Sequence, residues 1–135
     1  MPVMELVDVR QAAAVVLAPV ADSDPDVIVN VVDSLTPPAY MLVWNDPWLE
    51  VGVGAPTMGP CVWTAHLQVL CVAGRLEPGP GVETLEQMVS VALAAFRADT
   101  SYPWPPGDVS GPRVFNIAGL DYLATRINYA VPTTV

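Results

Sequence analysis

A single long segment of alternating side chains limits what this chain can fold into. From Cys61 to Ala73, one set of alternate positions is apolar throughout, and the other set mixes polar and apolar residues. Successive side chains of a strand point to opposite faces of a sheet, so this period predicts a long strand with one buried face. The buried face is predicted to carry Cys61, Trp63, Ala65, Leu67, Val69, Cys71 and Ala73. A second layer must therefore pack against this side of the sheet.

An amphipathic helix shortly after this strand can supply that layer. Residues 78–81 (Pro-Gly-Pro-Gly) form a turn sequence, and apolar side chains then recur every three or four residues from Val82 to Ala98. The predicted core stripe is Val82, Leu85, Val89, Ala92, Leu93 and Phe96. Within this stripe, we expect Leu85 and Val89 to be buried.

The beginning of the chain shows a second helical period. A helix is predicted over Val3–Ala18, and its apolar positions are Leu6, Val9, Ala13, Val16 and Leu17. Pro19 has no backbone N–H and is expected to end this helix.

The remaining strands complete the predicted architecture. β-Branched residues favour strands at Val27–Val32 and Ala39–Trp44. A hairpin is predicted from Arg113–Ala118 and Tyr122–Val131, joined around Gly119–Asp121. Together with the long strand, these segments predict an α+β fold: a mainly antiparallel sheet of about five strands with two helices packed on one face.

Two proline-rich segments, Asn45–Pro60 and Tyr102–Gly111, show no regular period and are predicted to be loops. The first contains Trp48 and the second contains Trp104. A large aromatic ring in such a loop either anchors an interface or plugs the core of its own subunit, and the sequence leaves both roles open.

The chain is rich in apolar residues and poor in charged ones. Hydrophobic residues make up 53% and charged residues 14% of a length that suits one domain spanning residues 1–135. So few charged groups leave apolar area on the surface, and we expect part of it to be buried against other subunits.

The charge of the chain is strongly negative. Its net charge of −9 arises from 14 acidic residues and 5 basic ones, all of which are arginine. A nucleic-acid-binding protein needs a basic surface, which this composition excludes. The acidity either maintains solubility or allows the protein to lie near DNA without adhering to it.

No segment has the residues of a recognised catalytic arrangement. His66 is the only histidine and lies in the middle of the predicted long strand, and the chain lacks the Gly-x-Ser-x-Gly sequence of serine hydrolases. We therefore expect His66 to be a partly exposed sheet residue rather than a catalytic base. Cys61 and Cys71 lie on the apolar face, where the reactive thiolate is disfavoured. These features predict that the protein is not an enzyme.

The acidic segment 22–26 (Asp-Ser-Asp-Pro-Asp) is similar to the start of a calcium-binding loop. Such a loop needs glycine at its sixth position and glutamate at its twelfth, where this chain has Val27 and Asp33. The glycines of residues 78–81 precede a helix, as in phosphate-binding loops, but the required lysine is missing. We therefore expect neither a bound metal nor a cofactor.

The cysteines and the first residues bear on the compartment. Cys61 and Cys71 share one predicted strand, so about 30 Å separates their Cα atoms, which is too far for a disulfide. The chain begins without the basic and apolar regions of a signal peptide, and its longest apolar run, Ala12–Ala21, is too short to cross a bilayer. We expect a protein that is made in a reducing cytoplasm and has no contact with a membrane.

Five segments carry a family resemblance when they are taken together and in order. They are 37–39 (PPA), 43–48 (VWNDPW), 73–79 (AGRLEPG), 102–105 (YPWP) and 126–132 (RINYAVP). In this combination the chain resembles the tail terminator (tail completion) proteins of long-tailed, siphovirus-type phages, especially those of actinobacterial hosts.

The resemblance implies a structural virion protein without enzymatic activity. Its subunits are expected to form a homo-oligomeric ring, most simply a hexamer, that caps the tail tube and ends its polymerisation. The expected partners are other copies of the chain, the tail tube protein and a head–tail connector (neck) protein, and genomic DNA passes through the ring without specific binding. Such a ring lies at the head-proximal end of the tail in the virion and is assembled in the host cytoplasm. Given the net charge, we expect carboxylates to dominate its lumen.

Two other classes stay open. One is a different ring component of the phage neck or tail, such as a head-closure protein or the major tail protein that forms the tube. The other is a small enzyme of unrecognised mechanism, for which a substrate-dependent activity lost on His66→Ala would be the sign.

The predicted docking site for the tail is the Asn45–Pro60 segment, with Trp48 as its leading anchor. It is longer than a hairpin needs, and the prolines and glycines between Gly52 and Pro56 should make it reach away from the sheet. The alternative is that it folds back over the core of its own subunit. The complete set of predicted interface residues is Asp46, Trp48, Leu49, Val51, Val53, Met58, Tyr102 and Trp104.

Overall fold

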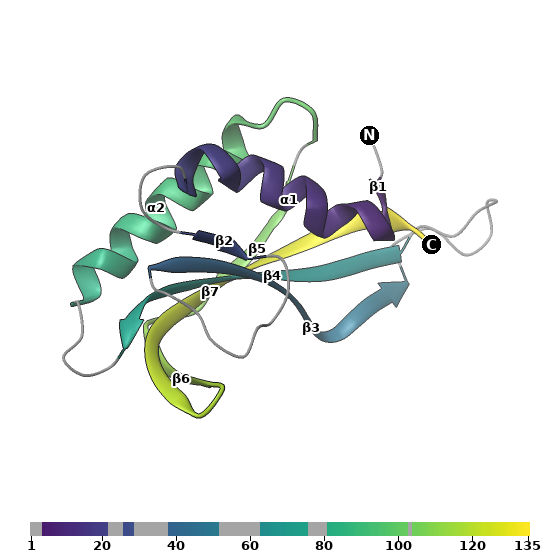
Figure 1. The fold of residues 1–135 in the computed structure, drawn as a ribbon. Coiled ribbons are helices and arrows are strands. Elements are labelled where there is room, and N and C mark those ends of the chain that lie inside the picture. The colour runs from purple at the N-terminus through teal and green to yellow at the C-terminus, as the bar shows by residue number, and fades with distance from the viewer. Residues whose placement is uncertain (1–3, 22–25, 29–37, 52–62, 76–80, 103) are drawn as a thin grey trace.

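The computed structural model describes residues 4–21, 26–28, 38–51, 63–75, 81–102 and 104–135. Both helices lie on one face of a sheet, and a curled hairpin projects beyond the opposite face (Figure 1). The α+β class and the position of the helices, as predicted from the sequence, are confirmed.

The described elements follow one another in this order: β1 (Met4–Glu5), α1 (Leu6–Ala21), β2 (Asp26–Ile28), β3 (Ala39–Val51), β4 (Trp63–Arg75), α2 (Val82–Ala98), β5 (Pro106–Val109), β6 (Arg113–Ile117) and β7 (Leu120–Thr134). The central strand β4 pairs antiparallel with β3 on one side and with β7 on the other. Beyond β3 lies β2, and β1, β5 and β6 all pair with the outer edge of β7. Both β1 and β2 run parallel to their neighbours.

The predicted number of about five strands is too small, whereas most of the strand pairings are antiparallel, as predicted. Among the described residues the sheet has 7 strands of mixed direction, although antiparallel pairs form its centre. The two strands that the sequence did not reveal are β1, with 2 residues, and β5, with 4 residues. Segments this short cannot show a period of two, so only their pairing with β7 defines them as strands.

The main hydrophobic core lies between the sheet and the helices. It contains one stripe from each helix and alternate side chains of β4. Its members from these three elements are Val9, Ala13, Leu17, Leu67, Val69, Cys71, Ala73, Leu85, Met88, Ala92 and Phe96. The buried face predicted for β4 is thus confirmed within the described residues, except that Trp63 is only half-buried, and Cys61 lies outside the described ranges.

Helix α2 has the bounds that its sequence period predicts, but its buried stripe is shifted. Leu85 is buried as expected, whereas Val89 is half-buried and Val82 is exposed. Met88 takes the buried position instead, and its carbonyl accepts a 2.9 Å hydrogen bond from the Tyr40 hydroxyl of β3. The apolar sequence allows either stripe, and packing on the sheet selects the one that contains Met88.

Helix α1 begins later and ends later than predicted. Met4 and Glu5 pair in parallel with Thr133 and Thr134, so tertiary pairing with β7 replaces the first helical turn. The helix then continues past Pro19 to Ala21. Proline removes one hydrogen bond to the carbonyl four residues earlier, and in an exposed last turn water can satisfy that carbonyl.

The segment predicted to be a loop from Asn45 to Pro60 is a strand over its first part. Strand β3 continues to Val51, with a register shift between Trp44 and Leu49 that contains the cis peptide bond Asp46–Pro47. The extension occurs because the long strand β4 offers pairing partners as far as Trp63. Residues 52–60, with Val53 and Met58, lie outside the described residues.

The Tyr102–Gly111 segment, also predicted to be a loop, contains β5. The hairpin of β6 and β7 is confirmed, but its turn lies at Ala118 and Gly119, one residue earlier than predicted. Both residues have positive φ angles, 53° and 83°, which suit the two central positions of a tight hairpin turn. A second apolar cluster, with Met41, Leu70, Val72, Tyr122 and Ala124 at its centre, forms on the face away from the helices.

Candidate interaction site on the edge strand β3

Two tryptophans form a pair on strand β3. The ring centroids of Trp44 and Trp48 lie 5.4 Å apart with an angle of 38° between the ring planes. Trp44 packs against the main core, whereas Trp48 remains 46% exposed. The guanidinium of Arg10, on α1, lies 5.9 Å from the centroid of the Trp44 ring, so a cation borders the pair.

The local backbone explains why the two rings meet. Asp46 donates its backbone N–H to the side-chain carbonyl of Asn45 at 2.8 Å, within the irregular stretch between Trp44 and Leu49. Regular pairing between β3 and β4 resumes where Leu49 pairs with Ala65. From Trp44 to Leu49, β3 advances only from Leu67 to Ala65 of β4, so this irregular stretch shortens the path and places Trp48 beside Trp44.

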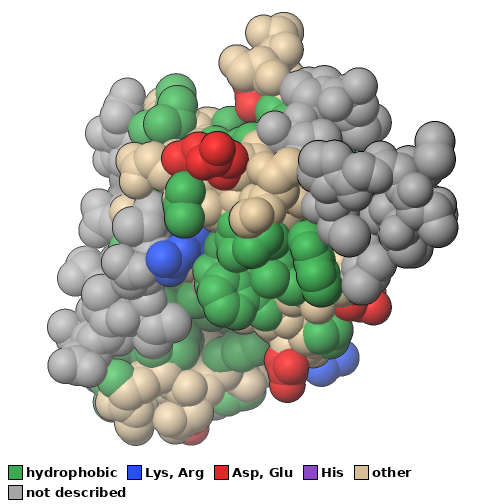
Figure 2. Space-filling view, turned by 90° about the vertical axis from the view of Figure 1, so that its right-hand side faces the viewer, with side chains coloured by type: hydrophobic (Ala, Val, Ile, Leu, Met, Phe, Trp, Pro, Cys, Tyr) green, Lys and Arg blue, Asp and Glu red, His purple; other side chains and the backbone are tan. Residues whose placement is uncertain are grey.

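This pair lies on an edge of the sheet. Strand β2 pairs only with Ala39–Met41 of β3, so no described residue pairs with the outer edge of β3 beyond Met41. On the side of the molecule where β3 ends, Figure 2 shows a group of hydrophobic side chains bordered by basic and acidic ones. Asp46 is exposed and Leu49 is half-buried in this region. The predicted anchor Trp48 is therefore accessible, but it lies on a strand edge and not on a projecting loop.

Tyr102 and Trp104, also predicted to be interface residues, belong to the subunit's own core. Trp104 is 6% exposed and donates its indole N–H to a carboxylate oxygen of Asp99 at 2.8 Å. Its ring meets Phe96 edge-on, with 5.0 Å between the centroids. The Tyr102 hydroxyl donates to the Pro132 carbonyl at 3.2 Å, and burial raises the pKa of Tyr102 to about 12. Of the two roles left open for Trp104, the structure supports the plug.

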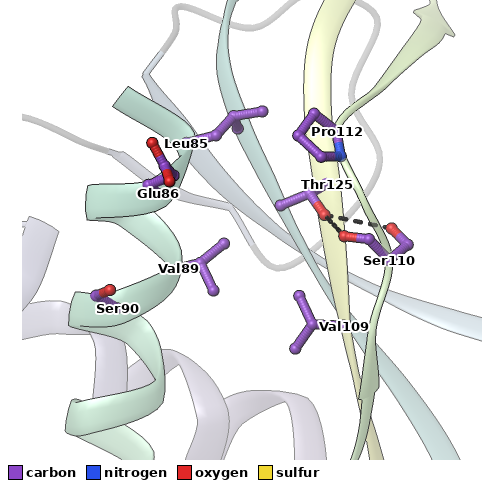
Figure 3. A pocket seen from close by; sticks show the side chains of 8 residues that line it. All are labelled: Leu85, Glu86, Val89, Ser90, Val109, Ser110, Pro112 and Thr125. Carbon is purple, nitrogen blue, oxygen red and sulfur yellow. Dashed lines mark hydrogen bonds between the residues drawn. The ribbon is translucent and has the colours of Figure 1, made fainter. Parts of the chain in front are cut away.

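A groove between α2 and β5 was not predicted. It has a volume of about 280 Å³, and its apolar walls come from Leu85, Val89, Val109 and Pro112. Val89 on the helix and Val109 on the strand point into the space between these two elements (Figure 3). The carboxylate-bearing Glu86 lies on the rim.

The strand wall of this groove is fixed by hydrogen bonds to β7. The Thr125 hydroxyl donates to the Ser110 carbonyl, and the Ser110 backbone N–H donates to the Arg126 carbonyl at 3.0 Å. Ser110 follows β5 directly, so these bonds hold the end of β5 beside α2 (Figure 3). The groove lies between two elements that are separated in the sequence. The only feature of the local sequence that indicated it was the apolar Val109 in a proline- and glycine-rich segment.

The face of the sheet away from the helices carries polar side chains. His66 Nε2 lies 2.5 Å from a Glu50 carboxylate oxygen, without the directionality of a hydrogen bond, and the His66 side chain is 24% exposed. His66 is thus a partly exposed sheet residue, as predicted. Farther along, Asn128 donates to Asp108, and Arg126 Nε has no hydrogen-bond partner among the described residues.

The described nucleophile candidate, Cys71, is not accessible from solvent. Cys71 is buried, and this burial raises the pKa of its thiol to about 12, which keeps it protonated and unreactive near neutral pH. Cys61, the other candidate, lies outside the described residues.

The described residues contain neither a metal-binding cluster nor a helix long enough to cross a membrane. No group of three or more His, Cys, Asp and Glu side chains within the described ranges could hold a metal ion. Of the acidic segment 22–26, only Asp26 is described, at the start of β2. A bilayer requires about 20 helical residues, and neither described helix, of 16 and 17 residues, could span one.

No protein-family model matches this chain, and no curated protein matches it.

Proposed function

We propose that the protein is a structural virion subunit that forms a ring on the phage tail tube, ends its polymerisation and provides a surface for head joining. The observation that carries this proposal is Trp48: a large aromatic side chain, 46% exposed, held against Trp44 on a strand edge. Both tryptophans belong to the VWNDPW segment on which the resemblance to tail terminator proteins rests. An exposed, pre-ordered tryptophan is typical of a protein interface, because its burial contributes a large area at a small entropic penalty.

The surface of the described residues supports assembly through more than one contact. Val7 and Val15 are exposed on α1, and Val91 and Val109 are exposed on α2 and β5. Single exposed valines are ordinary, but their number fits a chain with only 14% charged residues. A ring buries such side chains against neighbouring copies, the tail tube protein and the neck protein.

The charge of the chain supports passage of DNA through the ring. With a net charge of −9 per subunit, carboxylates in the lumen would repel the phosphate backbone and let the genome slide through. A ring whose lumen is lined by the arginines would contradict this part of the proposal. Those arginines are Arg10, Arg75, Arg97, Arg113 and Arg126.

Two alternatives predict different behaviour. A tube protein would polymerise into long structures, and a head-closure protein would join heads without limiting tail length. For an enzyme, the specific observation is the carboxylate of Glu50 beside His66. That reading requires a substrate-dependent activity that His66→Ala abolishes and Thr64→Ala, on the same face of β4, does not.

The experiment that tests the function is removal of the protein during phage assembly. In a phage that carries this chain, depletion should give overlong tails or tails without heads, and resupply of the native chain should restore normal particles. Normal tails joined to heads after depletion would contradict the proposal. Long tubes formed by the purified protein alone would favour the tube protein instead.

A further inference from the structure

We propose that Trp48 of one copy inserts into the α2–β5 groove of the next copy, so that the subunits join head to tail. This inference rests on the proposed ring function and assigns the surfaces that close the ring. The occupant of the groove is thus a second copy of this chain.

The two surfaces lie at opposite edges of the sheet. Trp48 lies on β3, and Val109 lies on β5, which is beyond β7 on the opposite side of the central strand β4. Two different surfaces at opposite edges of one sheet can repeat around a ring, because each subunit uses one surface for each neighbour. A single self-complementary surface would instead end the assembly at a dimer.

The groove and the tryptophan ring match in size and polarity. The groove volume of about 280 Å³ lies just below the range of small-molecule pockets, which begins at roughly 300 Å³. This size leaves room for one large side chain. Val109 is 44% exposed and Val89 is half-buried, so an inserted indole would cover apolar surface that the subunit leaves open.

The two surfaces carry opposite charges. Arg10 brings one of the 5 basic residues to the tryptophan pair. Glu86 lines the groove, and the exposed Glu83 lies one turn earlier on α2. Insertion of Trp48 would bring a cation on one copy toward two carboxylates on the next, which fixes the orientation of the contact.

This assignment changes the role predicted for Trp48. A loop that reaches away from the sheet would contact the tail. A side chain on the outer edge of β3 instead contacts the protein that lies beside the subunit. In a ring, the neighbour at a sheet edge is another copy. The tail tube would then bind to surfaces other than the Trp48 edge.

Two variants test the contact, each of which removes one of its halves. Trp48→Ala removes the inserted side chain, and Val109→Arg blocks the groove from an exposed position on β5. Val114→Arg is the matched control, because Val114 is 53% exposed on β6 and does not line the groove. Removing a buried interface tryptophan should weaken association by roughly 30-fold or more. Should Val109→Arg fail to fold, Ser90→Arg blocks the same groove from an exposed position on α2.

The decisive step is to mix the two variants and measure their mass by analytical ultracentrifugation. Each variant alone should remain a monomer at a concentration where the native chain and Val114→Arg assemble. The equimolar mixture should form two-subunit species, because one intact tryptophan meets one intact groove and the other two surfaces are blocked.

Several results would overturn this inference. Folded single variants that still assemble like the native chain would show that other surfaces close the ring, and would leave the proposed function untouched. A mixture of folded variants that stays monomeric would also reject the contact. A native chain that stays monomeric at high concentration would reject it as well, and phage depletion would then test the function separately.

Discussion

Trp48 and Trp104 each stand directly after a proline, in two segments of similar composition, yet they occupy opposite environments. Trp104 is 6% exposed and is surrounded by Phe96, Tyr102 and Tyr129. Trp48 is 46% exposed and stacks only on Trp44 among the described aromatic residues.

The difference follows from the neighbours that the fold brings to each ring. The segment with Trp104 crosses the gap between the end of α2 and β7, where aromatic side chains from three elements meet and Asp99 accepts the indole N–H. The segment with Trp48 belongs to β3, and beyond Met41 no described strand pairs with the outer edge of β3. A tryptophan beside proline therefore becomes core or surface according to distant partners and not according to its local sequence.

The largest effect should come from truncating the buried ring. Trp104→Ala removes an aromatic side chain from a close-packed cluster and leaves a cavity, so it should lower the free energy of unfolding by about 3–5 kcal/mol. Urea denaturation followed by circular dichroism measures this change. A near-native denaturation midpoint would contradict the role of Trp104 as a core plug.

Helix α2 offers a similar contrast between a core position and a groove position. Leu85 is 1% exposed, so Leu85→Ala should lower the free energy of unfolding by about 2–4 kcal/mol. Val89 is half-buried at the groove, and Val89→Ala should lower the free energy of unfolding by only about 1 kcal/mol. Equal losses for the two variants would show that the groove is closed in solution.

The sequence predicts the elements whose own side chains repeat with a period. The bounds of α2 and the buried face of β4 follow from that period, and so does the hairpin of β6 and β7. The sequence does not show pairing that depends on distant strands. Strand β5 forms because β7 extends far enough to pair with Pro106 and Val109. Strand β3 continues past Pro47 because β4 is long enough to pair with it. The site divides in the same way. Trp48 can be suspected from its segment, whereas the groove requires knowing that β5 ends beside α2.

A smaller effect should appear at the hydrogen bond that holds Trp104. Donation from the Trp104 indole lowers the pKa of the Asp99 carboxyl below its ordinary value. A carboxyl with a lowered pKa in the folded state contributes stability above the unfolded pKa, near 4, and this contribution is lost as the pH falls through the folded pKa. Asp99→Asn should therefore lower the free energy of unfolding by about 1 kcal/mol at pH 7 and have less effect at pH 3. Urea denaturation at both pH values measures the change in the free energy of unfolding. An equal loss at pH 7 and pH 3 would show that the Asp99 charge does not contribute to the effect.

The smallest change in stability should come from the exposed ring. Trp48→Ala should alter the free energy of unfolding of the monomer by less than about 1 kcal/mol, because the side chain has few partners within its own subunit. The same denaturation experiment, at a concentration below assembly, measures it beside Trp104→Ala. A loss as large as that of Trp104→Ala would mean that Trp48 is a core residue and would remove the basis for its role in assembly.

Negative-stain electron microscopy of the purified protein tests the central claim most directly, because the proposed function requires a closed ring. We expect rings of one fixed diameter in the native sample and in the Val114→Arg control, and no rings in Trp48→Ala. Open filaments of variable length would contradict the closed ring. Particles no larger than one subunit, even at high protein concentration, would contradict it as well.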